Sequence, residues 1–106
     1  GLVYLRAMEE RGHHCVILTK GPAACVNVCG FKVYSEDDLD KAEVFFKNKG
    51  LPTSWIIRPH QGRTLLTKDN HGMPIEFYHQ MDRLPTIHQK YKLYKGVKPL
   101  RIDHFK

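Results

Sequence analysis

Two side chains far apart in this sequence could carry out acid–base chemistry or bind a metal ion. Glu76 lies in an alternating segment in which Ile75 and Phe77 share one face, so its carboxylate belongs to the opposite, polar face. His104 lies in a strand-like segment near residue 106, and the neutral imidazole of a strand histidine suits a divalent metal ion. The alternative is a solvated carboxylate and an ordinary strand histidine, and spacing alone does not decide between the two.

The cysteines and two neighbouring histidines, His13 and His14, could suggest a zinc site. Structural zinc sites usually combine two closely spaced pairs of ligands, and only one such pair is present, formed by Cys25 and Cys29. Cys29 falls within an apolar strand-like run, so core packing explains it better. Cys15 has no evident activating environment that would make it a nucleophile.

A βαβββ unit, predicted between Val26 and Gln80, must position Glu76. Val26–Tyr34 is a short apolar run with β-branched residues, which is typical of a buried strand. A helix is predicted from Ser35 to Lys49, and a glycine and a proline just beyond it prevent its continuation. Three strand-like segments separated by glycine-bearing turns complete the unit: Ser54–Arg58, Arg63–Lys68 and Pro74–Gln80.

The predicted helix carries clear signals at its start and along one face. Ser35 is a candidate N-cap, and acidic residues fill the first turn, where the helix dipole favours negative charge. Leu39, Ala42 and Phe46 recur at helical spacing, while lysines occupy the other face. The pattern therefore predicts that these three side chains pack on the sheet.

Strand-like segments also flank this unit. Leu2–Met8 and His13–Thr19 indicate a hairpin with its turn at residues 9–12, and two strands alone cannot bury their apolar faces. Beyond residue 82 the periodicity weakens and allows one or two helical turns, and Pro99–Lys106 is typical of the opening of another strand. Together with the missing initiator methionine, these ends predict an internal fragment of a longer protein.

Composition bounds the possible partners. Hydrophobic residues make up 42% and charged residues 26%, and no apolar run approaches the roughly 20 residues that span a bilayer, so no membrane association is expected. The net charge is +6, and the segment from Arg83 to Lys106 holds seven Lys or Arg residues and one Asp. Such a basic tail is compatible with nucleic acid, but no recognition motif accompanies it, so a solvated linker face is the preferred interpretation. Three cysteines, an odd number, and no visible signal peptide predict a reducing cytoplasm.

Six motifs spread along the chain point to one family. They are Tyr4-Leu5-Arg6 with Glu9-Glu10, His13-His14 with Leu18-Thr19-Lys20-Gly21-Pro22, Asp38 through Glu43, Asp69-x-x-Gly72-x-Pro74-x-Glu76-Phe77, Tyr91-x-Leu93-Tyr94, and Arg101-Ile102-Asp103-His104-Phe105. With these motifs the chain resembles the type I extradiol ring-cleavage dioxygenases of the vicinal oxygen chelate superfamily, of the homoprotocatechuate and catechol 2,3-dioxygenase type. The resemblance covers essentially the whole chain, and the last motif is the most specific.

The resemblance implies an α+β fold and a domain plan. Such enzymes have four βαβββ modules, two in each domain, with the metal site in the C-terminal domain. On that plan, residues 1–20 are the last two strands of a preceding module and residues 21–82 are a complete module. Residues 83–100 are then the connection between domains, and residues 101–106 the first strand of a truncated catalytic domain.

The resemblance also implies what each candidate residue does. In the family, iron(II) or manganese(II) is held by two histidines and one carboxylate, and His104 matches the first of these histidines. Residues 21–82 look like an empty module, because Val28 stands where a catalytic module has its histidine and Glu76 is a vestige of the carboxylate. Asn70 departs from the proline common after the turn aspartate, which should affect the turn and not the chemistry. No catalytic residue and no other cofactor-binding residue is expected within the 106 residues.

The expected function of the whole protein is therefore iron(II)-dependent cleavage of a catechol ring by dioxygen, in the cytoplasm and in a homo-oligomer. In that chemistry the metal ion binds both catechol oxygens and dioxygen, and the ring bond beside the diol breaks. The isolated 106-residue chain is expected to be inactive. A binding or scaffold module of the same fold is the alternative, and a basic RNA-binding module rests only on the charge of the tail.

Overall fold

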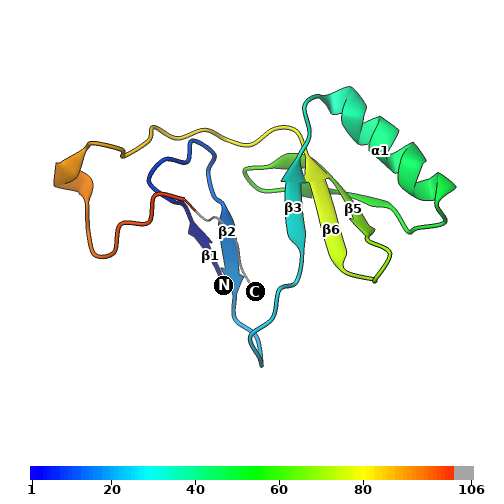
Figure 1. Cartoon of the computed structure of the whole chain (residues 1–106), viewed down its shortest axis with the longest axis horizontal. Helices are drawn as coiled ribbons and strands as arrows, with labels where there is room; N and C mark the ends of the chain where they lie inside the picture. The colour runs from blue at the N-terminus through cyan, green and yellow to red at the C-terminus, as the bar shows by residue number, and fades with distance from the viewer. Residues whose placement is uncertain (102–106) are drawn as a thin grey trace. The chain divides into compact units, whose positions relative to one another are not determined.

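A computed structural model describes residues 1–101 and has a mixed α+β fold, as predicted (Figure 1). The chain divides into two compact units. Unit 1 contains residues 1–23 together with the described residues from 82 onward, and unit 2 contains residues 24–81. Unit 1 has a two-stranded sheet and unit 2 has a four-stranded sheet with one helix.

Unit 2 has the predicted βαβββ order. Its elements are β3 (Cys29–Lys32), α1 (Glu36–Asn48), β4 (Ser54–Arg58), β5 (Gly62–Lys68) and β6 (Pro74–Tyr78). The strands lie in the order β3-β6-β5-β4, with β3 parallel to β6 and the other neighbours antiparallel. This order makes β3 and β4 the two edges of the sheet and places β5 and β6 at its centre.

The first strand of unit 2 is shorter than the predicted Val26–Tyr34. Its ladder with β6 begins at Cys29, which pairs with Ile75, and ends at Lys32, which pairs with Tyr78. Continuing the register by one residue would place Val28 beside Pro74, which has no N–H to donate. The prediction was wrong in length because the strand's extent depends on its partner, which lies more than forty residues away in the sequence.

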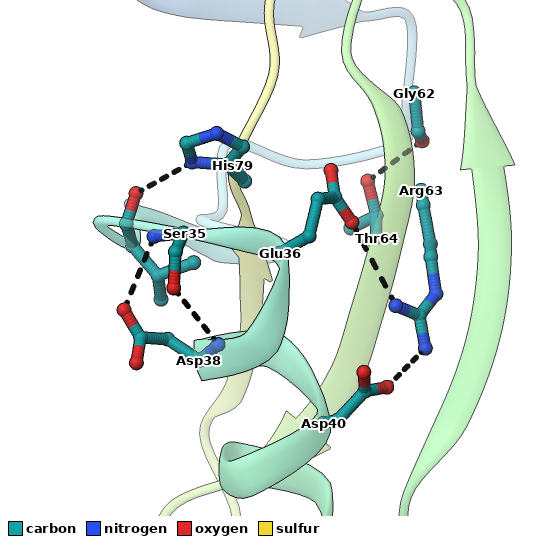
Figure 2. A network of polar contacts seen from close by, with 9 residues as sticks. Ser35, Glu36, Asp38, Asp40, Gly62, Arg63, Thr64 and His79 are labelled. Atoms are coloured by element: carbon teal, nitrogen blue, oxygen red, sulfur yellow. Dashed lines mark hydrogen bonds and ion pairs between the residues drawn. The ribbon is translucent and has the colours of Figure 1, made fainter.

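The predicted helix is confirmed, with Ser35 and Lys49 as its caps. The Ser35 hydroxyl accepts a hydrogen bond from the Asp38 N–H, and the Asp38 carboxylate accepts one from the Ser35 N–H, so the two residues form a capping box (Figure 2). Hydrogen bonding from Ser35, and after it from Lys41, lowers the pKa of Asp38 below its ordinary value of 3.8. At the other end Gly50 has φ +70°, the left-handed conformation that commonly ends a helix.

The predicted apolar face of α1 packs on one face of the sheet. Leu39 is completely buried, whereas Ala42 and Phe46 are half-buried. The Phe46 ring lies 5.5 Å from the ring of Phe77 on β6, and Leu65 of β5 is completely buried. The core of unit 2 is therefore this layer between α1 and the two central strands.

Polar contacts fix α1 against the same face of the sheet. Arg63 of β5 forms a hydrogen bond and ion pair with Asp40 and a longer ion pair with Glu36, at 3.7 Å (Figure 2). Its guanidinium also lies 3.9 Å from the centre of the Trp55 ring of β4. The hydrogen bond to Asp40 is the main cause that raises the pKa of Arg63.

Unit 1 contains the predicted antiparallel pair in a shorter form. Its strands are β1 (Leu2–Leu5) and β2 (Val16–Thr19), and the connection between them is residues 6–15, in place of a tight turn at 9–12. The backbone of this connection bonds to residues much later in the chain: Met8 to Pro99, Glu9 to Leu100, His13 to Asp82, and Arg11 to Leu84. The predicted pairing of the two strands is confirmed, but the predicted strand lengths and tight turn were wrong, because the partners of the connection are non-local and leave no local signal in the sequence.

The remainder of unit 1 is mostly irregular. A single turn of 3-10 helix, η1 (Tyr91–Leu93), is the helical structure between residues 82 and 101, in agreement with the expectation of one or two turns. The predicted strand Pro99–Lys106 lies only partly within the described residues. The carbonyl groups of Pro99 and Leu100 accept hydrogen bonds from the connection at residues 6–15. Residues 102–106 lie outside the described part. Within residues 1–101 no helix has the length and apolar character to cross a membrane.

Candidate functional site

The predicted metal ligand His104 lies outside the described residues, so its role stays a prediction. Within residues 1–101, no three His, Cys, Asp or Glu side chains are grouped so that they could hold a metal ion. This result also covers the zinc hypothesis for Cys25, Cys29, His13 and His14. Cys25 is exposed and donates to Asn27 Oδ1 at 3.3 Å, and Cys29 is half-buried on β3.

Glu76 lies on the face of the sheet opposite α1, as its alternation with Ile75 and Phe77 predicted. It is 4% exposed, and Arg58 Nε, at the end of β4, donates to its Oε2 at 2.7 Å. The Arg58 side chain is 31% exposed and reaches from the edge strand to β6. The buried carboxylate is thus neutralised by a guanidinium of the same unit.

The second oxygen of Glu76 is held by Gln61 in the turn between β4 and β5. Gln61 Nε2 donates to Glu76 Oε1 at 2.9 Å and to Thr64 Oγ1 at 3.2 Å, and the Thr64 hydroxyl donates to the Gly62 carbonyl at 3.1 Å. Gln61 is 2% exposed and Thr64 is completely buried. Because the Thr64 hydrogen goes to a carbonyl, its oxygen must accept from Gln61, which fixes the orientation of the Gln61 amide.

These residues do not fit a metal ion. Both oxygens of Glu76 face hydrogen-bond donors, and the nearest charged group is a cation, which repels a metal ion. Val28, half-buried and just before β3, supplies no ligand atom in its side chain. Sequence reasoning identified the Glu76 face correctly but missed Arg58 and Gln61. A buried Glu76 carboxylate requires a cation nearby, and this requirement could have directed the search to an arginine on another strand of the sheet.

A second polar cluster lies in unit 1 around the adjacent histidines. His13 Nδ1 lies 3.1 Å from His14 Nδ1, and the Tyr4 ring packs against both imidazoles at 5.2 and 4.9 Å. Neighbouring strand residues would point to opposite faces, but His13 lies in a bend before β2, so the two rings converge. His14 is buried, at 8% exposure. The tautomers of the two rings decide which Nδ1 donates this hydrogen bond and which accepts it.

Unit 1 also contains a basic pocket of about 580 Å³. Three of its lining side chains are cations, Arg11, Arg83 and Lys90, and the others are Leu84, Pro85 and Thr86. None of the three cations forms an ion pair with any residue of the described chain. The arrangement attracts anions in general but contains no group that would specify one.

The carboxyl groups with lowered pKa values in unit 2 lie in the cap of α1, in its middle and in the turn before β6. Asp69 accepts hydrogen bonds from the N–H groups of Met73 and His71, both at 2.8 Å, and the bond from Met73 is the main cause that lowers its pKa. The turn is formed with Asn70 at the position that departs from the family proline. A hydrogen bond from Lys47 is the main cause that lowers the pKa of Glu43. These groups stabilise local structure and are not acid–base candidates.

Comparison with known proteins shows what the chain is similar to. No protein-family model matches the chain. It is 26% identical, over 96% of its length, to the manganese-dependent 2,3-dihydroxybiphenyl 1,2-dioxygenase of Geobacillus genomosp. 3, of which it covers 36%.

Solved structures give the same result. The chain superposes with a TM-score of 0.89 on homoprotocatechuate 2,3-dioxygenase of Brevibacterium fuscum, with 34% identity over 98% of the chain and 30% of that enzyme. The corresponding enzyme of Arthrobacter globiformis gives a TM-score of 0.89 and 32% identity, over 98% of the chain and 33% of that enzyme. The chain spans about a third of the length of these relatives. It is therefore a homologue, over that third, of the extradiol dioxygenases of the vicinal oxygen chelate fold.

Proposed function

We propose that this chain is part of a metal-dependent extradiol dioxygenase that cleaves a catechol ring with dioxygen. The observation that carries the proposal is the match over 98% of the chain, at 34% identity and a TM-score of 0.89, to a homoprotocatechuate 2,3-dioxygenase. The relative from Geobacillus is named for 2,3-dihydroxybiphenyl. Both compounds carry two adjacent ring hydroxyls, so a catechol is the substrate class that the relatives share.

Within such an enzyme, the 106 residues would divide as the resemblance implies. Residues 1–20 would be the last strands of a preceding module, residues 21–82 a complete module, 83–100 the connection and 101–106 the first strand of the catalytic domain. The self-contained βαβββ order of unit 2, at residues 24–81, supports the second of these assignments. The pairing of β1 with β2 supports the first.

The metal ion would be bound mainly by residues beyond this chain, with His104 as its single ligand here. Iron(II) is the proposed metal, and manganese(II) is the alternative, because one relative is named manganese-dependent. When bound, the ion would supply the redox centre at which catechol and dioxygen meet. A cytoplasmic location and a homo-oligomer, with no nucleic-acid or membrane partner, complete the proposal.

The test compares two single variants of the full-length protein. His104→Ala should lose both the bound metal and oxygen uptake with catechol substrates, while circular dichroism shows an intact fold. Glu76→Gln should keep its metal content per folded molecule, because Glu76 is bound by Arg58 and Gln61. Metal analysis beside oxygen uptake decides the matter. Loss of metal in Glu76→Gln, with retention of metal in His104→Ala, would show that the metal site has been assigned to the wrong module.

A non-catalytic binding or scaffold module of the same fold is the second candidate. Both candidates expect the described residues 1–101 to hold no group of three metal-ligating side chains, so that result does not separate them. On either proposal the 106-residue chain alone should neither retain iron(II) nor cleave catechols. A full-length protein that binds an aromatic diol but contains no stoichiometric metal and consumes no dioxygen would favour the second candidate.

A further inference from the structure

The polar face of the unit 2 sheet contains a carboxylate that is buried and fully engaged. The Glu76 side chain is 6% exposed, and its two oxygens accept from Arg58 at 2.7 Å and from Gln61 at 2.9 Å. A buried carboxylate without a cation would be strongly unfavourable. Arg58 is the cation nearest to it among the described ion pairs, so the stability of this face depends on one guanidinium.

The neighbouring strand β3 leaves space for the Glu76 carboxylate. Gly30 of β3 pairs with Glu76 in the parallel ladder, and a Cβ at Gly30 would lie 3.5 Å from Glu76 Oε1. On the other side, Gln61 cannot turn its amide oxygen toward the site, because Thr64 requires the amide N–H₂ as a donor. The groups around Glu76 are thus hydrogen-bond donors and a planar cation, a set that suits a guanidinium and not a metal ion.

We propose that Arg58 is the resident cation of a carboxylate site on the unit 2 sheet, that its guanidinium keeps metal ions out of this site, and that the site accepts a free guanidinium-type cation when the Arg58 side chain is removed. The inference rests on contacts within unit 2 and holds whether or not the whole protein cleaves catechols. Its readouts are stability and cation binding, so its failure is distinguishable from failure of the proposed activity.

The first experiment is a double-mutant cycle in the full 106-residue chain, followed by thermal unfolding. Arg58→Met leaves the carboxylate without its cation and should lower the Tm by about 10 °C. Glu76→Gln should lower it less, because Arg58 is 31% exposed and keeps access to water. The double variant, which removes both charges, should have a higher Tm than Arg58→Met alone.

Additive losses in the cycle would overturn the proposal. If Arg58→Met does not fold, the double variant still decides: folding of the double variant supports the dependence on charge, and its failure to fold contradicts it. Arg63→Met is the matched control, since Arg63 lies on a neighbouring strand and pairs with the exposed Asp40. Adding Asp40→Asn, which removes the partner carboxylate, to Arg63→Met should not restore the Tm.

The second experiment is chemical rescue with methylguanidinium. At about 20 mM, far below the molar concentrations at which guanidinium unfolds proteins, it should raise the Tm of Arg58→Ala by a few degrees through binding to the folded state. The rise should be absent in Arg58→Ala/Glu76→Gln and in Arg63→Ala. Equal rises in all three variants, or none in Arg58→Ala, would overturn the proposal.

A third measurement tests the exclusion of metal ions. Millimolar Mn²⁺ should change the Tm of the unsubstituted chain and of Glu76→Gln equally, because Glu76 is not available to it. A Mn²⁺ effect that disappears with Glu76→Gln would show that metal ions reach this carboxylate, and would contradict the role given to Arg58.

Discussion

The two units of this chain differ most in how they balance charge. Unit 2 contains seven Lys or Arg and seven Asp or Glu residues, and several of them meet in ion pairs, including the partly buried pair of Arg58 and Glu76. Within the described residues, unit 1 contains three carboxylates and nine cations: Arg6, Arg11, Lys20, Arg83, Lys90, Lys92, Lys95, Lys98 and Arg101. The excess positive charge of the described chain therefore lies entirely in unit 1.

Their cores differ in the same sense. Unit 2 packs a helix on a four-stranded sheet through fully buried leucines, whereas unit 1 has two short strands and buries Ala7, Met8 and His14. Each unit has one buried side-chain atom without a hydrogen-bond partner in the described chain: a guanidinium nitrogen of Arg6 in unit 1 and the hydroxyl oxygen of Thr67 in unit 2. Unit 2 therefore has the larger apolar core and the better balance of charge, and unit 1 is the weaker of the two in both respects.

The largest effect should come from the core of unit 2. Leu39→Ala removes a completely buried side chain and should lower the free energy of unfolding by about 3 kcal/mol, measured by urea denaturation. Phe46→Ala should cost less, about 2 kcal/mol, because Phe46 is only half-buried. Val44→Ala, at a position 56% exposed, is the control. Losses below about 0.5 kcal/mol for Leu39→Ala would show that the assigned face is wrong.

The charge contrast predicts weak, unspecific binding of polyanions through unit 1. A random single-stranded oligonucleotide should bind with a Kd of about 10⁻⁴–10⁻⁶ M at physiological salt, and it should be released as the salt concentration is raised further. Arg11→Gln/Arg83→Gln should weaken this binding several-fold, and Arg63→Gln in unit 2 should not. Binding that survives the salt or depends on base sequence would indicate a nucleic-acid partner and contradict the proposed function.

Loss of the helix cap should have a smaller effect on unit 2. Ser35→Ala removes the acceptor of the Asp38 N–H and should lower the free energy of unfolding by about 1 kcal/mol. Ser35→Asp, which preserves a hydrogen-bond acceptor at this position, should retain most of the free energy of unfolding of the unsubstituted chain. Equal losses in both variants would show that the hydroxyl is not the source of the effect.

Acid should weaken unit 2 by a still smaller amount. The pKa values of Asp38 and Asp69 are lower in the folded chain than their ordinary value of 3.8, so their contribution is complete above that pH and is lost as the pH falls below it. The urea concentration at the midpoint of unfolding should therefore decrease as the pH is lowered from about 5 to about 2. Asp69→Asn should flatten part of this slope.

The sequence predicted the parts of this fold that are determined locally. The start of α1 at Ser35, its buried Leu39 and the strand Ser54–Arg58 were predicted because capping, helical periodicity and β-branched runs are properties of neighbouring residues. The connection at residues 6–15 was not, since its hydrogen bonds go to residues 82–100. The length of β3 was also missed, because Pro74 limits it from another strand.

The same division applies to the candidate site. The face occupied by Glu76 followed from alternation, but its partners Arg58 and Gln61 come from two other segments and could not be identified by spacing. The convergence of His13 and His14 depends on a bend that strand periodicity does not predict. His104 was identified through the family motif and stays a prediction.

The division of unit 1 into two sequence segments has a consequence for folding kinetics. Its closing hydrogen bonds, Met8 to Pro99 and His13 to Asp82, join residues separated by the whole of unit 2. In an unfolded chain such bonds close a long loop at an entropic cost that grows with loop length. Once residues 24–81 have folded, the loop is effectively much shorter. Unit 2 should therefore gain protection from hydrogen exchange first during refolding, and the amides of Met8 and His13 should gain it in a later phase.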